Sequence, residues 1–315
     1  MMQNDFMPNV IGQTQLKKQF SMFARNFMKT GINPFFCLEG PRGYGKTMLT
    51  REYCKELKDP QGRPRPLMEI NAAELTCMKN FIEIWFPKMR ENNAALFIDE
   101  AHLLDIKKFQ SPLLTICEES KSPIRHYKYE DREEGERTCT FDFREYCIFF
   151  ATTDQQKLVG PLKDRLEPLA ISHYSEDELW QIFELGLECT VSDQVKDEII
   201  SIFRGHPRSC VKLAKNLNSF AVGVGSDYIN QVKWKEFRDL MGIHDYGLTE
   251  QELNIIKVLG NGPLALQDIA AKTEYSKGVI QHQYELQIKK KGLIFTDGKR
   301  HLTSKGHTFY RKTFL

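Results

Sequence analysis

The segment from Gly40 to Thr47 reads GPRGYGKT and follows the apolar run Phe35-Phe36-Cys37-Leu38. A glycine-rich loop between a buried strand and a helix can wrap its backbone N–H groups around phosphate oxygens. In such a loop Lys46 reaches the β- and γ-phosphates of ATP, and the Thr47 hydroxyl binds Mg²⁺. The sequence therefore predicts a phosphate-binding loop (P-loop) at a nucleotide site. Its contacts are expected to come from Gly40, Gly43, Tyr44, Gly45, Lys46 and Thr47.

Two carboxylates, Asp99 and Glu100, follow a second apolar run at residues 94–98. The carboxyl ends of parallel strands share one edge of a sheet, so this pair is expected to meet the P-loop there. Asp99 is predicted to hold the hydrated Mg²⁺ and Glu100 to polarise the attacking water. Residues 99–102 also spell a helicase box, but those enzymes carry two ATPase-like cores and further motifs that are not found in this sequence.

A third apolar run, Cys147–Ala151, ends in the hydroxyls of Thr152 and Thr153. Strand, P-loop, helix, acidic strand and hydroxyl-tipped strand follow one another as in the AAA+ ATPases, which the chain thus resembles. The resemblance makes Thr153 the sensor-1 residue near the γ-phosphate; the plain alternative is a threonine in a turn. The expected fold class is α/β, with a parallel P-loop sheet, a small helical lid and a C-terminal winged helix.

Over nearly its whole length the chain resembles RuvB, the family of bacterial Holliday-junction branch-migration motors. The segments that carry this resemblance are Val10–Gln13, the P-loop, Ile98–Glu100, Ala151–Thr153, Pro161–Arg165 and Arg204–Arg208. The implied domains are an ATPase domain at 1–171, a lid at 172–244 and a winged helix at 245–315.

The same resemblance assigns roles to residues outside the P-loop. It makes Arg165 the arginine finger that reaches the nucleotide of a neighbouring subunit, and Arg208 the sensor-2 arginine of the lid. Val10, Ile11 and Tyr174 would line the adenine pocket. Guanidinium groups suit these roles because they stay charged and donate in a planar fork. The plain alternative for either arginine is a surface ion pair.

The C-terminal region points to nucleic acid independently. Its pattern predicts helices at 249–259, 266–272 and 276–290 and a hairpin with strands at 293–295 and 301–303, which together make a winged helix. Residues 277–312 hold nine Lys and Arg against two acidic residues, whereas the whole chain carries only +2. Such a block can neutralise DNA phosphates, although a solvated face with lysines at a helix C-terminus is the alternative.

Within this basic block the predicted DNA contacts are Lys289, Lys290, Lys291, Lys299 and Arg300. RuvB wings usually carry Pro-Arg-Gly-Arg where this chain has Asp297-Gly298-Lys299-Arg300. One arginine is therefore missing, and Lys299 keeps the charge.

Residues 122–141 predict a hairpin between the acidic strand and the sensor-1 strand, with strands at 124–129 and 138–141 and a Glu-rich turn between them. The RuvB hairpin at this place docks on its partner RuvA through apolar residues. The charged and aromatic hairpin here implies a RuvA-like partner or a different surface, and a merely solvated excursion is the alternative.

Composition is ordinary for a globular protein, with 41% hydrophobic and 27% charged residues. The sequence contains no apolar stretch of bilayer length and no signal-peptide pattern, which predicts a cytoplasmic location. Eight scattered cysteines without a Cys-x-x-Cys pair predict reduced thiols rather than a zinc site.

Two functional classes follow from these patterns. The first is an ATP-driven motor that acts as a homo-oligomer, a hexamer by resemblance, on duplex or four-way junction DNA. The second is a loader or initiator ATPase that switches an assembly on DNA, since such proteins also join an AAA+ core to a winged helix. The hairpin and the segment Leu162–Arg165 favour the motor.

Overall fold

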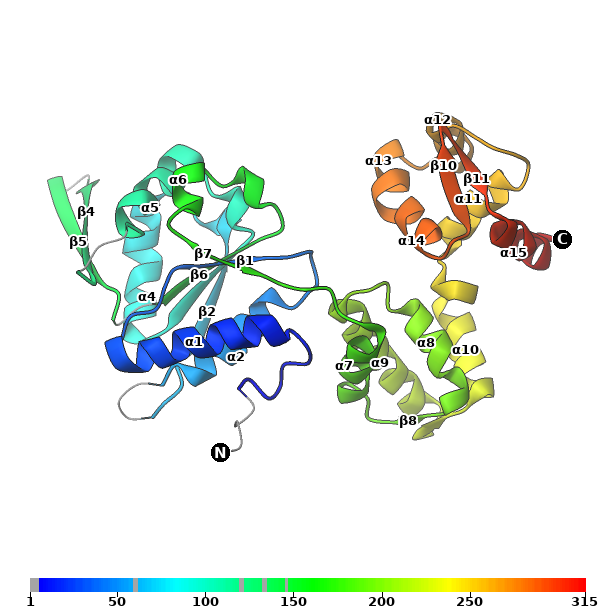
Figure 1. Cartoon of the computed structure of the whole chain (residues 1–315), viewed down its shortest axis with the longest axis horizontal. Helices are drawn as coiled ribbons and strands as arrows, with labels where there is room; N and C mark the ends of the chain where they lie inside the picture. Colours follow the sequence, from blue (N-terminus) through cyan, green and yellow to red (C-terminus); the bar gives the residue numbers. More distant parts are fainter. Residues whose placement is uncertain (1–5, 59–61, 119–121, 132–134, 145–146) are drawn as a thin grey trace. The chain divides into compact units, whose positions relative to one another are not determined.

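The computed structural model describes residues 6–58, 62–118, 122–131, 135–144 and 147–315. The chain divides into two compact units, Met1–Tyr174 and Ser175–Leu315 (Figure 1). The first unit corresponds in extent to the predicted ATPase domain with three further residues. The predicted boundary at residue 244 falls within the second unit and stays a prediction.

A five-stranded sheet with the order β2-β3-β6-β1-β7 forms the centre of the first unit. All neighbouring strands run parallel. Their bounds are β1 Phe36–Glu39, β2 Leu67–Asn71, β3 Ala95–Asp99, β6 Cys147–Thr152 and β7 Glu167–Ala170. Strand β6 thus lies between the strand that enters the P-loop and the strand that ends in the carboxylates.

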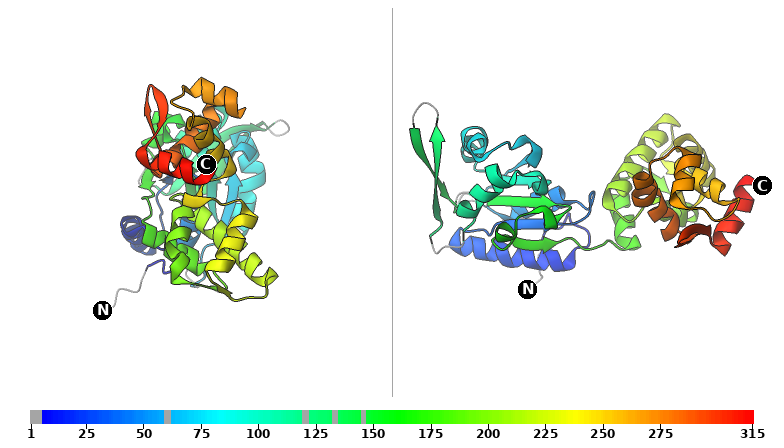
Figure 2. Two further views of the ribbon diagram at one scale, coloured as in Figure 1. Left: turned by 90° about the vertical axis from the view of Figure 1, so that its right-hand side faces the viewer. Right: turned by 90° about the horizontal axis from the view of Figure 1, so that it is seen from above.

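Helices cover both faces of this sheet, so successive side chains of one strand enter different cores. The views of Figure 2 show helices on either side of the sheet. Phe97 and Phe149 pack into the core that includes α1 and α2, whereas Ile98 and Phe150 pack into the opposite core. The helices are α1 Thr14–Thr30 and α2 Lys46–Glu56 on one face, and α3 Met78–Asn80, α4 Phe86–Glu91, α5 Ser111–Ile116 and α6 Gly160–Lys163 on the other. Burial on both faces explains the unbroken apolar runs, and the predicted α/β class is confirmed.

The predicted hairpin is formed by β4 Ile124–Asp131 and β5 Gly135–Asp142, which pair antiparallel at one end of the first unit (Figure 1). Its strands are longer than predicted, because the ladder continues through Glu130 and Glu136 into the expected turn. The remaining turn residues, 132–134, lie outside the described part of the chain. Phe141 anchors the base of the hairpin against Phe86, with ring centroids 4.6 Å apart.

The first part of the second unit is a helical lid. Its elements are α7 Glu176–Leu185, α8 Lys196–Ile202, α9 Pro207–Gly223 and α10 Gln231–Met241, with a short parallel pair of β8 Thr190–Val191 and β9 Tyr228–Ile229. Phe183, Phe203 and Trp234 are fully buried and fill its core. Ser175 and Glu178 form a capping box that begins α7, which fits the preference for Ser at this position.

The rest of the second unit has the predicted three helices and hairpin. The elements are α11 Glu250–Leu259, α12 Leu266–Thr273, α13 Lys277–Val279, a π-helical turn Ile280–Tyr284, α14 Glu285–Lys290, β10 Ile294–Asp297, β11 Lys299–Leu302 and α15 Ser304–Phe314. The strands reach closer to Gly298 than predicted, so Lys299 and Arg300 lie in β11 rather than in a turn. Helix α15 was not anticipated; a Cβ on its Gly306 would lie 2.0 Å from the Leu293 carbonyl oxygen, so glycine permits its close packing.

All eight cysteines are free thiols, as predicted, and five of them are buried. Within the described ranges, every helix is too short or too polar to cross a membrane.

Candidate nucleotide site and nucleic-acid interface

The P-loop connects the carboxyl end of β1 to the first turn of α2. Gly43 and Gly45 have φ angles of 85° and 87°, which only glycine adopts without strain. At Gly40 an added Cβ would lie 3.1 Å from the Ile171 Cβ, so this position is also restricted by space. These glycines let the backbone curl tightly at the start of a helix, where N–H groups and the helix dipole favour anions.

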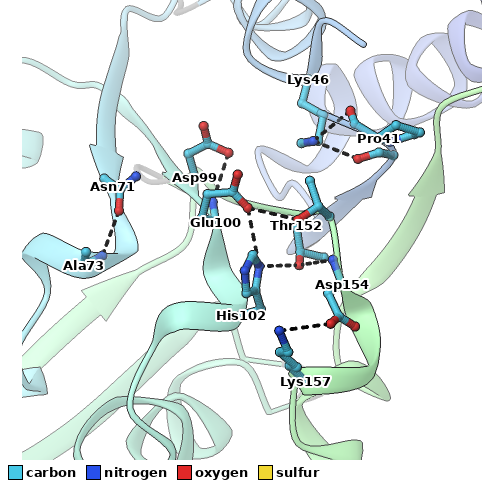
Figure 3. A network of polar contacts seen from close by, with 12 residues as sticks. Pro41, Lys46, Asn71, Ala73, Asp99, Glu100, His102, Thr152, Asp154 and Lys157 are labelled. Carbon is cyan, nitrogen blue, oxygen red and sulfur yellow. Dashed lines mark hydrogen bonds and ion pairs between the residues drawn. The ribbon is translucent and has the colours of Figure 1, made fainter. Parts of the chain in front are cut away.

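Lys46 is the first residue of α2, and its side chain turns back over the loop. Its Nζ donates hydrogen bonds to the carbonyl oxygens of Gly40, at 2.8 Å, and Pro41, at 3.3 Å (Figure 3). The ammonium group is thus held beside the loop that would surround the phosphates. Thr47 follows at the second position of α2, with a half-buried side chain.

Asp99 and Glu100 lie at the carboxyl end of β3. Glu100 adopts a left-handed backbone conformation, with φ 53° and ψ 44°, and its N–H donates to the Asp99 Oδ1 at 2.9 Å. A non-glycine residue in this region costs about 1–2 kcal/mol and persists only where its surroundings hold it. The turn aims the Glu100 carboxylate toward the end of the neighbouring strand β6.

The end of β6 holds that carboxylate. Thr153 Oγ1 donates to the Glu100 Oε2 at 3.2 Å. His102 Nδ1 lies 3.4 Å from the same oxygen and 3.0 Å from the Thr152 Oγ1, which also accepts the Asp154 N–H (Figure 3). The predicted sensor-1 threonine and the predicted catalytic glutamate are therefore in direct contact.

His102 was not predicted as a site residue. The sequence showed it only as the last letter of a helicase box, and nothing in that pattern placed it beside Thr152. Its ring is 11% exposed and contacts both Glu100 and Thr152, so it is a positioning residue for the glutamate. A histidine three positions after a strand end could be recognised from sequence only if the strand order were already known.

The predicted adenine-pocket residues lie close to the P-loop. Val10, Tyr44 and Tyr174 belong to one apolar cluster, and the Tyr174 hydroxyl donates to the Tyr44 carbonyl oxygen at 3.3 Å. The Tyr44 hydroxyl lies 2.8 Å from the His173 Nδ1, and burial raises the pKa of Tyr44. Ile11 follows Val10 and is half-buried. Their contact with adenine stays a prediction.

Arg165 and Arg208 occupy separate units. Arg165 follows α6 and its Nη1 donates to the Pro161 carbonyl oxygen at 2.7 Å, while its buried Nε has no hydrogen-bond partner among the described residues. Arg208 is the exposed second residue of α9 in the second unit. The roles of both arginines toward ATP stay predictions.

The basic residues in and next to the wing hairpin, β10 and β11, were predicted to contact DNA, but several of them contact protein groups. Glu285 is only 3% exposed and pairs with Lys289, at 2.6 Å, and Arg300, at 3.1 Å. Thr296 Oγ1 donates to the same carboxylate at 3.1 Å. Arg300 is 12% exposed and fastens β11 to α14. Two of the five predicted DNA contacts are thus engaged by a buried carboxylate.

A third predicted DNA contact, Lys291, is also engaged within the protein. Its Nζ donates to the Ser201 carbonyl oxygen of α8 at 2.6 Å, and burial lowers its pKa. Lys290 and Lys299 are exposed. Lys289 is exposed as well, but its ammonium group pairs with Glu285.

Residues 36–172 match the AAA family, described as ATPases associated with various cellular activities. The Holliday junction branch migration complex subunit RuvB of Campylobacter hominis is 26% identical over 308 residues, which cover 94% of this chain and 86% of that protein. The corresponding subunit of Kosmotoga olearia is 27% identical over 94% of this chain and 85% of that protein.

Residues 36–172 thus form an AAA-type ATPase domain, and the chain as a whole is similar to RuvB. Its fold is similar to the structure of the Thermotoga maritima RuvB Holliday junction branch migration motor, with a TM-score of 0.68, 24% identity and coverage of 96% and 95% of the two chains. A variant of the same RuvB aligns with a TM-score of 0.70 at 23% identity, over 97% of each chain. The AAA domain, together with the similarity to RuvB, makes the chain an ATP-hydrolysing enzyme.

Replacement of Glu100 by Gln tests its predicted role as the base of the nucleotide site. The amide keeps an acceptor for Thr153 but loses the charge that polarises water, so kcat is expected to fall by about 10²–10⁴-fold. ATP affinity is expected to stay within about threefold, because the phosphate contacts of the P-loop remain. Steady-state hydrolysis and equilibrium ATP binding measure the two effects. Glu91→Gln, at the exposed end of α4, is the matched control, and an unchanged kcat in Glu100→Gln would exclude the assigned role.

Glu285→Gln tests the buried carboxylate of the wing. Burial alone would raise the pKa of Glu285, but hydrogen bonds from Lys289, Arg300 and Thr296 hold it below its ordinary value of 4.5. A lowered folded-state pKa contributes stability that is present above pH 4.5 and is lost as the pH falls through the folded value. The variant is expected to lose about 3 kcal/mol of unfolding free energy at pH 7, and less in acid.

Urea unfolding of the whole chain at pH 7 and pH 4 measures this difference, with Glu236→Gln on the exposed face of α10 as control. A deficit in Glu285→Gln that is the same at both pH values would contradict the ion-pair interpretation.

Proposed function

We propose that this chain is an ATP-driven motor that moves four-way (Holliday) DNA junctions in recombination and repair. The observation that carries the proposal is similarity to RuvB over more than nine-tenths of the chain. Like a motor of this kind, the chain joins a P-loop ATPase domain to a winged helix. The similarity covers the lid and the winged helix as well as the ATPase core. Similarity that extends through the lid and the winged helix favours the motor over a loader or initiator.

In the proposed reaction, Lys46 and the P-loop N–H groups bind the phosphates of ATP. Glu100, held by Thr153 and His102, orients the attacking water and accepts its proton. Arg165 of a neighbouring subunit and Arg208 of the lid stabilise the charge that grows on the phosphate oxygens. Interactions that strengthen only in the transition state are the ones that raise kcat.

The residues present fit a Mg²⁺ ion that arrives with ATP. The Thr47 hydroxyl and the Asp99 carboxylate are the hard oxygen ligands that Mg²⁺ prefers. In the described part of the chain, no group of three or more His, Cys, Asp or Glu side chains could hold a metal alone. This suits Mg²⁺, which usually keeps waters and shares one or two protein ligands with substrate phosphates. The ion would neutralise phosphate charge.

Lys290 and Lys299 are the proposed contacts to the DNA backbone. They are exposed on α14 and β11, whereas Lys291 and Arg300 contact protein groups and the exposed Lys289 pairs with Glu285. Lysine contacts to phosphates give affinity that depends on salt and little on sequence, as a motor that travels along DNA requires.

The proposed assembly is a homo-oligomeric ring, a hexamer by similarity to RuvB, with the hairpin β4–β5 as the docking site for a RuvA-like protein. The exposed face of this hairpin carries polar pairs, His126 with Thr140 at 3.0 Å and Lys128 with Glu136 at 2.7 Å. A partner would therefore bind through hydrogen bonds and charge as well as apolar contact. Eight free cysteines suit a reducing compartment, and we place the activity in the cytoplasm, where bacterial DNA lies.

Branch migration of a synthetic four-way junction tests the proposed function. With ATP and Mg²⁺ the parental protein is expected to convert the junction to products, and more rapidly with a RuvA-type protein. Lys46→Ala is expected to abolish migration, since the loop loses its phosphate-binding cation. ATP hydrolysis and DNA binding by the parental protein without any migration, with or without the partner, would contradict the proposal.

A further inference from the structure

A second arginine, Arg204, lies in the loop that joins α8 to α9, four residues before Arg208 of α9. Arg204 has a φ of 54° and is followed by Gly205 with a φ of 80°. Two successive left-handed residues turn the chain sharply, so the Arg204 side chain reaches the winged helix while Arg208 enters α9. A non-glycine residue in this conformation must be held by its surroundings.

A carboxylate of the winged helix holds it. The Arg204 Nη1 and Nη2 donate to the two carboxylate oxygens of Glu252 at 3.0 and 2.9 Å, and Nη2 also donates to the Gly247 carbonyl oxygen at 3.2 Å. Glu252 is 0% exposed and accepts the Thr249 N–H at 2.8 Å in the capping box that begins α11. Arg204 and Glu252 therefore form a bidentate ion pair, the Arg204–Glu252 fork, and the capping box at the start of α11 holds its carboxylate in place.

Two further contacts lie beside this pair. Lys291, at the end of α14, donates to the Ser201 carbonyl oxygen in α8. Gly247, between the lid and α11, packs so closely that an added Cβ would lie 2.9 Å from the Ile202 Cα.

A separate group of ion pairs also joins the lid to the winged helix. Arg238 of α10 bridges Glu198 at 2.7 Å and Asp245 at 2.8 Å, and Asp245 pairs with Lys312 of α15. Charged contacts thus join the lid to the winged helix at several points.

Stability alone does not explain a buried ion pair, because well-packed apolar residues often serve as well or better. A bidentate arginine–carboxylate pair supplies geometry instead, since it fixes both the distance and the angle between two elements. A fixed angle matters most between parts that must move together.

We infer that Arg204 and Glu252 are positioning residues that couple the nucleotide-dependent position of Arg208 to the orientation of the winged helix. The bound nucleotide thereby alters the affinity of the winged helix for DNA. The inference rests on the proposed function, in which Arg208 contacts ATP and the winged helix contacts DNA. A shift of Arg208 on nucleotide exchange moves Arg204 through the four-residue loop, and the fork carries this shift to the first turn of α11. Without the fork, each domain still binds its own ligand, but neither affects the other.

The coupling ratio measures this directly. It is the Kd of the full-length protein for duplex DNA with ADP, divided by the Kd with a non-hydrolysable ATP analogue. In the parental protein the ratio is expected to differ from one by at least about fivefold, in the usual range for coupled sites. In Glu252→Gln it is expected to fall to within about twofold of one, while ATP-analogue affinity without DNA stays unchanged.

Two variants make the result specific. Glu250→Gln makes the same chemical change two residues away, at an exposed side chain that pairs with His244, and is expected to keep the parental ratio. Arg204→Lys keeps the positive charge beside Glu252 but loses the planar fork, so it is expected to lower the ratio without leaving an unpaired buried carboxylate. This second variant keeps the test decisive if Glu252→Gln folds poorly, which thermal unfolding reports.

A coupling ratio that is one in the parental protein, or that survives in both Glu252→Gln and Arg204→Lys, would overturn the inference. The junction assay separates this from the proposed function. A parental protein with a coupling ratio but no migration would disprove the motor and leave the fork standing. Migration with unaltered ATP cost per junction in folded Glu252→Gln would disprove the fork and leave the motor standing.

Discussion

The nucleotide site depends on the position of β6 between β3 and β1. Because the three strands are parallel and in close register, Asp99, Thr152 and the start of the P-loop leave the sheet at the same edge. Glu39 pairs with Thr152, and the Gly40 N–H donates to the Thr152 carbonyl oxygen at 3.4 Å. A phosphate-binding loop, a hydroxyl strand and a carboxylate strand therefore converge without any of them reaching across the sheet.

Because β6 lies beside β3, the strained backbone of Glu100 can direct its carboxylate to a defined partner. The backbone of Glu100 is left-handed at the end of β3. Its carboxylate therefore reaches Thr153, which follows β6, and also lies close to His102. A relaxed backbone at this position would aim the carboxylate elsewhere. The strain is thus repaid by orientation of the one group expected to act on water, and the fully buried Thr152 fixes the histidine that helps to hold it.

Sequence reasoning succeeded where a local pattern carries the physical cause. The P-loop glycines, the carboxylates after an apolar run and the hydroxyls after the next run are all read from neighbouring residues. The sheet order explains why these three motifs meet, but the motifs could be found without it. The same holds for the helices of the winged domain, whose apolar periodicity and Thr249 cap mark their bounds.

It failed where the partner of a side chain is distant in sequence. A count of charges in residues 277–312 treats Glu285 as one anion among many cations, yet this single buried carboxylate engages both Lys289 and Arg300. Lys291 likewise faces Ser201, ninety positions earlier in the chain. No periodicity records such pairs, and the Arg204–Glu252 fork was missed for the same reason.

In the proposed motor each hydrolysis site is completed by a neighbouring subunit, so that hydrolysis requires the ring. Mixing two inactive variants tests it most directly: Arg165→Ala keeps an intact P-loop but offers no finger, whereas Lys46→Ala offers a finger but binds ATP poorly. Each alone is expected to hydrolyse ATP about 10³-fold or more below the parental rate. In an equal mixture about a quarter of the subunit interfaces pair an intact site with an intact finger, so hydrolysis is expected to return to a similar fraction of the parental rate. A mixture no more active than its separate components, under conditions where the subunits exchange, would contradict the shared site.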